Sequence, residues 1–152
     1  MMKELKLKRI QAGAEIVEFA VILPFLLLVM FGIMEFGLVF YDKALITNAS
    51  REAARSGIAY KCPVLSADEI KAVSDGYNGF LISFGASVPP TVTVSPTPPT
   101  STTNCGANSG TPLTVTVTYS YQFLVFGNLI SLFVSGFNNP LSLSATTVMN
   151  YE

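Results

Sequence analysis

The sequence predicts an α+β protein: a long N-terminal transmembrane and stalk helix, then a small domain with one short helix and a three-stranded antiparallel sheet. Three observations predict it. Residues 19–41 form an apolar run interrupted only by Glu35, residues 66–75 carry a helix-capping pattern, and three later segments alternate between apolar and polar residues. We therefore divide the chain into a basic segment (1–13), the long helix (14–60) and the small domain (61–152).

The apolar run is long enough to cross a membrane. At about 1.5 Å per residue, residues 19–41 span about 35 Å, and a bilayer core is about 30 Å thick. Pro24 is tolerated in a membrane helix because neighbouring groups satisfy the freed carbonyl. No A-x-A-like cleavage pattern follows the run, so we expect the helix to stay on the protein. It can continue to residue 60, because residues 42–60 contain no proline.

The charge distribution bears on orientation and partners. Four basic residues lie before position 13, and four more (Lys43, Arg51, Arg55 and Lys61) follow the span, so the count alone is a tie. The leader position of the first group, the cysteine pair and the uncharged stretch 76–151 favour a cytoplasmic N-terminus and an extracytoplasmic C-terminal domain. A net charge of −1 gives no reason to expect nucleic acid as a partner.

The small domain is predicted element by element. Ser66 and Glu69 form a capping box for a short helix over 67–75, with Ile70 and Val73 facing inward. Residues 91–94, 113–121 and 141–149 alternate as strands do. Residues 87–112 form a proline-rich loop region that contains the first of these strands. The apolar segment 123–134 is too short to span a membrane; it either packs into the core or leans on a bilayer or a neighbouring subunit.

Cys62 and Cys105 are expected to form a disulfide, because two thiols beyond an export signal are usually paired. The alternative is two separate buried thiols. The chain has no histidine and no phosphate-binding or nucleophile motif. We therefore expect no metal, no cofactor and no enzymatic activity.

The N-terminal residues resemble a known family. A basic leader, Gly13, Glu18 and an apolar helix are the pattern of a type IV prepilin. More narrowly, the chain is similar to TadE-like pseudopilins in three motifs: the segment 13–20 followed by Leu23-Pro24, the segment 31–37, and the Ala- and Arg-rich segment 47–57. This resemblance covers about a third of the chain.

The resemblance implies a minor pilin or pseudopilin of a Tad (tight adherence) system, in which Flp pili mediate surface adhesion. Gly13 is then the residue before a prepilin peptidase cut, and Ala14 is the mature N-terminus. The implied partners are that peptidase, other Tad pilins or pseudopilins and the inner-membrane assembly platform. Glu15 departs from the simple pattern, since it places a second carboxylate beside the new terminus.

Two carboxylates flank the apolar run, Glu18 and Glu35, about 26 Å apart along the helix. We expect Glu18 to pair with the new α-amino group of Ala14 and so set the axial register between subunits. Glu35 has two readings: a register role of the same kind, or a simple mark of the helix end. Ala49, Ala53 and Gly57 form a small-residue stripe that either packs against other pilin-like helices or belongs to an ordinary solvated helix.

A second function stays open at this stage. The chain would then be an uncleaved single-pass envelope protein whose exported domain binds a partner or a carbohydrate. Retention of residues 1–13 distinguishes it from the pseudopilin.

Overall fold

The structure is a computed structural model of the 152-residue chain. It describes residues 2–59, 61–84, 88–98, 110–125, 127 and 140–151, and for residues 2–12 the backbone alone. The chain separates into two units, Met1–Phe36 and Gly37–Glu152, and each is described by itself.

The first unit is the N-terminal part of helix α1, which runs over Met2–Ile58. The side chains of residues 13–31 are exposed on every side of the helix, with Leu23 alone half-buried. Most of them are large and apolar, including Phe19, Phe25 and Leu26. Among the described residues, one helix is long and apolar enough to cross a membrane, and it is this one. Within the described part of the chain, this apolar surface is therefore exposed.

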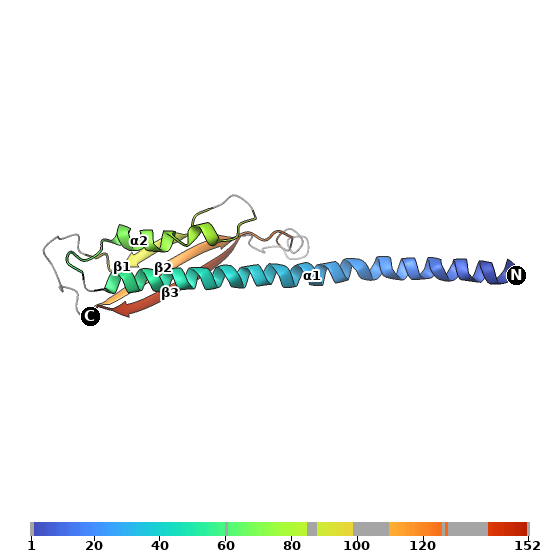
Figure 1. Cartoon of the computed structure of the whole chain (residues 1–152), viewed down its shortest axis with the longest axis horizontal. Helices are drawn as coiled ribbons and strands as arrows, with labels where there is room; N and C mark the ends of the chain where they lie inside the picture. Colours follow the sequence, from blue (N-terminus) through green and yellow to red (C-terminus); the bar gives the residue numbers. More distant parts are fainter. Residues whose placement is uncertain are drawn as a thin grey trace. The chain divides into compact units, whose positions relative to one another are not determined.

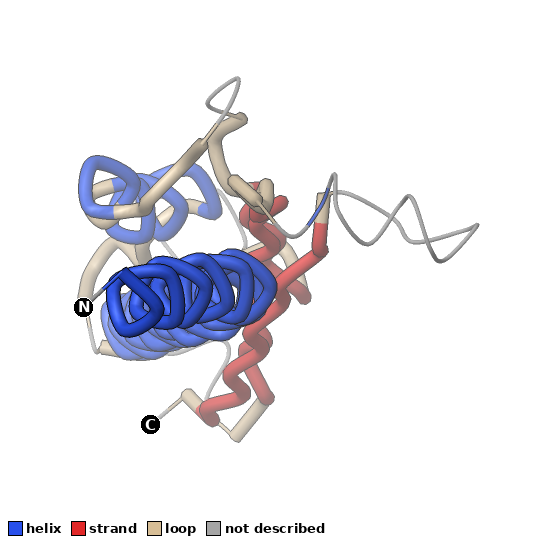
Figure 2. The backbone as a smooth tube through the Cα atoms, turned by 90° about the vertical axis from the view of Figure 1, so that its right-hand side faces the viewer, coloured by secondary structure: helices blue, strands red, loops and turns tan. Residues whose placement is uncertain are grey.

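The second unit contains the rest of α1, helix α2 (Ala67–Asp75), a short 3-10 helix (Asn78–Phe80) and three strands. The strands are β1 (Thr91–Ser95), β2 (Pro112–Tyr121) and β3 (Leu141–Asn150), antiparallel in the order β1-β2-β3. Both helices lie on the same side of the sheet (Figures 1 and 2). The central strand β2 has Val117 opposite Val92 of β1 and Ala145 of β3.

The two faces of the sheet differ sharply in chemistry. Alternate residues of β2 point toward the helices and are fully buried: Leu113, Val115, Val117, Tyr119 and Tyr121. The other face consists almost entirely of serine and threonine and carries no charge. This period-two pattern is the expected result of packing an antiparallel sheet on one side only.

The predicted fold class is confirmed, and so are the short helix and its cap. The Ser66 hydroxyl accepts from the Glu69 N–H, and the Glu69 carboxylate accepts from the Ser66 N–H at 2.8 Å. Ile70 is fully buried, whereas Val73 is only half-buried. Each strand begins or ends within one residue of its predicted bound. The predicted loop 96–110 and the apolar segment 123–134 lie largely outside the described residues.

Helix α1 begins earlier than the domain division at residue 13, because residues 2–12 are already helical. These residues are rich in lysine, leucine and arginine, which are good helix formers. Pro24 lies inside the helix without ending it.

Candidate functional site

The predicted processing residues lie on an exposed stretch of α1. Gly13, Ala14, Glu15 and Glu18 are all solvent-exposed, and a Cβ added at Gly13 would meet no other atom within 4 Å. The backbone there is helical. Glycine destabilises a helix by about 1 kcal/mol relative to alanine, so Gly13 weakens the helix locally. The position is sterically open to an enzyme.

The two predicted carboxylates differ in environment. Glu18 is exposed, whereas Glu35 is buried, with 4% of its surface accessible. An exposed carboxylate keeps its hydration without cost, whereas a buried one loses it. The two carboxylates thus differ in exposure, while the register role of Glu18 and both interpretations of Glu35, a register role or a mark of the helix end, stay predictions.

The small-residue stripe is a packing surface within the second unit. Ala49, Ala53 and Gly57 are all buried. A Cβ added at Gly57 would lie 2.5 Å from Leu113 Cδ2 of β2 and 2.8 Å from Ile70 Cδ1 of α2. The small residues thus allow β2 and α2 of the same chain to pack closely against α1. In this conformation they are not presented to a helix of another subunit, and they are not solvated.

A group that the sequence did not single out lies one residue past the predicted span. Asp42 of α1 is fully buried. Its Oδ1 accepts from the Ile82 N–H at 3.0 Å, while its Oδ2 has no hydrogen-bond partner. The Tyr119 hydroxyl of β2 donates to the Ile82 carbonyl at 2.9 Å. Side chains from α1 and β2 therefore hold both backbone polar groups of Ile82.

Burial is the largest cause of the pKa shifts in this cluster. It raises the pKa of Asp42 above its ordinary 3.8, and the Ile82 N–H opposes that rise. Burial also raises the pKa of Tyr119 above 10.0; a hydrogen bond with the Ser83 side chain lowers it, and the charge of Asp42 raises it further. A buried carboxylate in which one oxygen accepts no hydrogen bond is costly, and this favours the protonated form.

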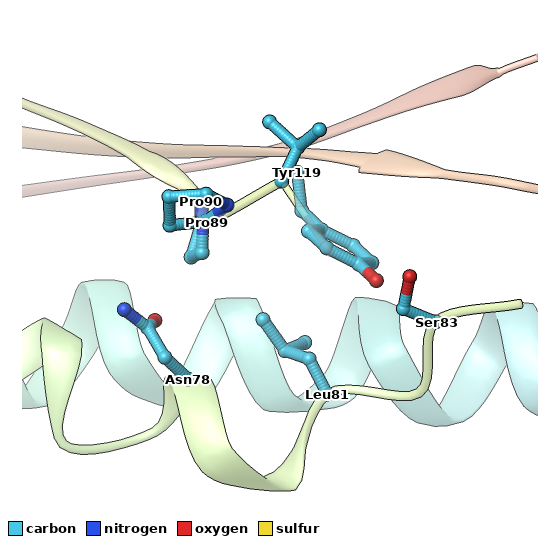
Figure 3. A pocket seen from close by; sticks show the side chains of 7 residues that line it. Asn78, Leu81, Ser83, Pro89, Pro90 and Tyr119 are labelled. Atoms are coloured by element: carbon cyan, nitrogen blue, oxygen red, sulfur yellow. The ribbon is translucent and has the colours of Figure 1, made fainter. Parts of the chain in front are cut away.

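A small pocket of about 80 Å³ adjoins the cluster. Figure 3 shows the Tyr119 ring and the Ser83 hydroxyl on one side of it, with Leu81, Pro89 and Pro90 around them. Among the described residues that line it, Tyr119 is the one ionisable group. We assign no chemistry to this pocket.

Two further polar contacts join α1 to the sheet. The Ser50 hydroxyl, fully buried, lies 3.0 Å from the Val115 carbonyl and 2.8 Å from the Thr147 hydroxyl. The Lys43 ammonium donates to the Ser144 carbonyl of β3. These contacts fix the helix at one rotation and one height on the sheet.

The predicted disulfide and the expected absence of a metal site both involve residues that lie partly outside the described ones. Cys62 is exposed in the connection between α1 and α2, and Cys105 lies outside them, so their pairing stays a prediction. Within the described part of the chain, no group of three or more His, Cys, Asp or Glu side chains could hold a metal ion.

Comparison with known proteins bears on the N-terminal helix. Residues 13–55 match the model of the TadE-like protein family. This confirms the resemblance inferred from the motifs. The match begins at Gly13 and ends within the α1 segment that packs on the sheet. No curated protein and no solved structure matches the chain.

Sequence reasoning missed the Asp42–Ile82–Tyr119 cluster and the Lys43 contact. The spacing of Asp42 could have indicated its burial. It lies seven residues after Glu35 and seven before Ala49, which places all three on one face of the helix. The partners of Asp42 and Lys43, Ile82 and Ser144, lie forty to a hundred residues further along the chain, so no local sequence pattern predicts these contacts.

Proposed function

We propose that this chain is a minor pilin or pseudopilin of a Tad system. A prepilin peptidase cuts it after Gly13, and it acts with other Tad pilins or pseudopilins and the inner-membrane platform in assembling a Flp pilus for surface adhesion. The observation that carries the proposal is the family match over residues 13–55, which contains Gly13, Glu18 and the apolar helix in the expected order.

The surface of the first unit supports this proposal. Its apolar side chains are exposed around the whole helix, which suits a segment that lies first in lipid and later among other helices of a filament. In the proposed orientation the N-terminus is cytoplasmic and the second unit is extracytoplasmic. An oxidising compartment would then favour a Cys62–Cys105 bond.

Glu18 is assigned the register role. Cleavage creates an α-amino group at Ala14, which is cationic at neutral pH. In a low-dielectric assembly, an amine and a carboxylate are stable only when each has the other as a partner. Among the described residues Glu18 is exposed, which leaves its carboxylate accessible to the Ala14 amine of its own or a neighbouring subunit.

The test is a complementation assay in a Tad-competent strain that lacks this gene. We expect Glu18→Ala to abolish surface pili and Glu18→Gln to reduce them strongly, because both remove the charge. Glu15→Ala is the matched control, since Glu15 is equally exposed and lies on the same helix. Normal piliation with Glu18→Ala would contradict the proposed register role of Glu18.

Loss of the whole gene without any effect on pili would contradict the wider proposal. It would favour the uncleaved single-pass envelope protein, with a partner- or carbohydrate-binding exported domain, as the alternative.

A further inference from the structure

The two edges of the sheet are protected very differently. β3 has ten residues, without proline or charge, and in the described part of the chain it pairs with β2 alone. β1, the opposite edge, has five residues and lies between Pro90 and Pro96. Prolines and short length blunt an edge, whereas a long uncharged edge is a template for another strand. Of the two edges in the described part of the chain, β3 is the one whose length and composition allow it to extend the sheet.

The register identifies the backbone groups that face this edge. The Gly110 N–H donates to the Tyr151 carbonyl at 2.9 Å, and the Tyr151 N–H donates to the Thr111 carbonyl at 3.0 Å. Bonded and non-bonded pairs alternate along an antiparallel ladder. The odd-numbered residues of β3 therefore bond to β2, and the even-numbered ones direct their N–H and C=O groups away from it: Ser142, Ser144, Thr146, Val148 and Asn150.

The Lys43 contact supports this register and shows how the edge is held. The ammonium of Lys43 donates to the carbonyl of Ser144, one of the groups that the ladder leaves unbonded. A lysine at an edge is a device that natural proteins use against unwanted strand pairing. Here it reaches the strand from α1 and occupies one acceptor.

We propose that the β3 edge is a self-association surface, on which β3 of one copy pairs with β3 of a second copy, and that Lys43 restrains this pairing. Two observations select a second copy as the occupant. Residues 76–151 carry no charge, so two copies do not repel each other there. The blunted β1 edge cannot continue the sheet, so pairing of β3 with β3 closes after two copies instead of growing into a fibre.

The pairing rests on the proposed function only in one respect. A shared membrane raises the effective concentration of one copy for another, which favours a weak edge contact. The backbone chemistry of the edge does not depend on cleavage after Gly13.

The experiment measures self-association of the full chain in detergent micelles by analytical ultracentrifugation over a range of protein-to-detergent ratios. Thr146→Lys places a like charge on each of the two facing strands and is expected to weaken association at least about fivefold. Thr93→Lys is the matched control, because Thr93 is an exposed threonine on the same face at the other edge. It should leave association unchanged.

Two further variants keep the test decisive. Lys43→Met retains the aliphatic part of the side chain but removes the ammonium that occupies the Ser144 carbonyl. It should therefore strengthen association. Thr146→Pro removes an outward N–H without removing a bond to β2, and should abolish association while circular dichroism still reports the fold.

A chain that stays monomeric even with Lys43→Met would overturn the proposal. So would equal effects of Thr146→Lys and Thr93→Lys, or β3 protection from hydrogen exchange that appears only when a different protein is added. The N-terminus is read by mass in the same samples. An uncleaved chain that still pairs through β3 would contradict the proposed processing and leave this inference standing.

Discussion

Two stretches of one helix behave differently. From residue 13 to 31, α1 is exposed all round; from Val39 to Gly57 it buries a residue every three or four positions. The first stretch is apolar on every face, whereas the second has apolar, small and polar side chains on the buried face, such as Ile46, Ala53 and Asp42, and charges such as Arg51 on the other. The distribution of polarity around the helix, and not helix propensity, thus separates a segment exposed on every side from one that packs on the sheet.

The acidic residues repeat this contrast. Glu18 is exposed at the start of the apolar stretch, and Asp42 is fully buried where the packed stretch begins. We propose that Glu18 meets the Ala14 amine, whereas Asp42 holds a loop of its own unit through Ile82. Carboxylates beside an apolar run therefore need not share a role.

The largest expected effect comes from the same substitution made at two isoleucines of α1, one inside the packed stretch and one before it. Ile46 is 1% exposed and Ile33 is 71% exposed. Ile46→Ala should cost about 3 kcal/mol of stability in the second unit, because it removes buried surface and leaves a cavity. Ile33→Ala should leave that stability unchanged. Native-state hydrogen exchange of the β2 amides in the detergent-solubilised chain measures both, and equal effects would contradict the division.

Glycine substitutions sharpen the same comparison. Gly57→Val should destabilise the second unit by about 2 kcal/mol, because its Cβ would press on Leu113 and Ile70. Gly37→Ala is the control: nothing lies within 4 Å of the added Cβ, so we expect a gain of about 0.5 kcal/mol from helix propensity. The measurement is the thermal unfolding midpoint. Destabilisation at both sites would mean that the packed surface extends further than the structure shows.

The Asp42 cluster predicts a pH dependence. Because burial raises the native pKa of Asp42 above 3.8, the native state binds this proton more tightly than the unfolded state does. Its stabilising contribution is therefore present at low pH and is lost as the pH rises from 3.8 through the raised native value. Asp42→Asn keeps an acceptor for the Ile82 N–H and should remove this pH dependence.

Stability curves for both proteins between pH 4 and pH 7 measure the effect, with the advantage of Asp42→Asn growing as the pH rises. Asp42→Ala should be about 1–2 kcal/mol less stable than Asp42→Asn, since it also leaves the Ile82 N–H unsatisfied. Parallel curves for wild type and Asp42→Asn would refute a buried, titrating carboxylate.

The smallest effect belongs to the cap of α2. Ser66→Ala removes the acceptor of the Glu69 N–H and should cost about 1 kcal/mol. Hydrogen exchange of the first-turn amides of α2 tests this locally. Ser56→Ala is a suitable control, because the Ser56 hydroxyl bonds a carbonyl within its own helix, at Ala53. A similar loss in both variants would argue against the capping box.

The features that could be predicted from the sequence are those that depend on neighbouring residues alone. The capping box placed α2 at residues 67–75, and period-two alternation placed the three strands. The sequence did not reveal the partner of the small-residue stripe or the burial of Asp42. Both depend on α1 meeting β2 and the Ile82 loop, contacts between segments far apart in the chain. A carboxylate next to an apolar run looks the same in sequence whether it faces water or a buried N–H.

The most direct test of the account is the intact mass of the chain extracted, without reduction, from membranes of a host that contains a prepilin peptidase. We expect a mature protein that begins at Ala14, with a mass lower by residues 1–13 and no thiol free to react at Cys62 or Cys105. A full-length mass would contradict it, because Gly13 would then be an ordinary helix residue and the protein would stay in the membrane uncut.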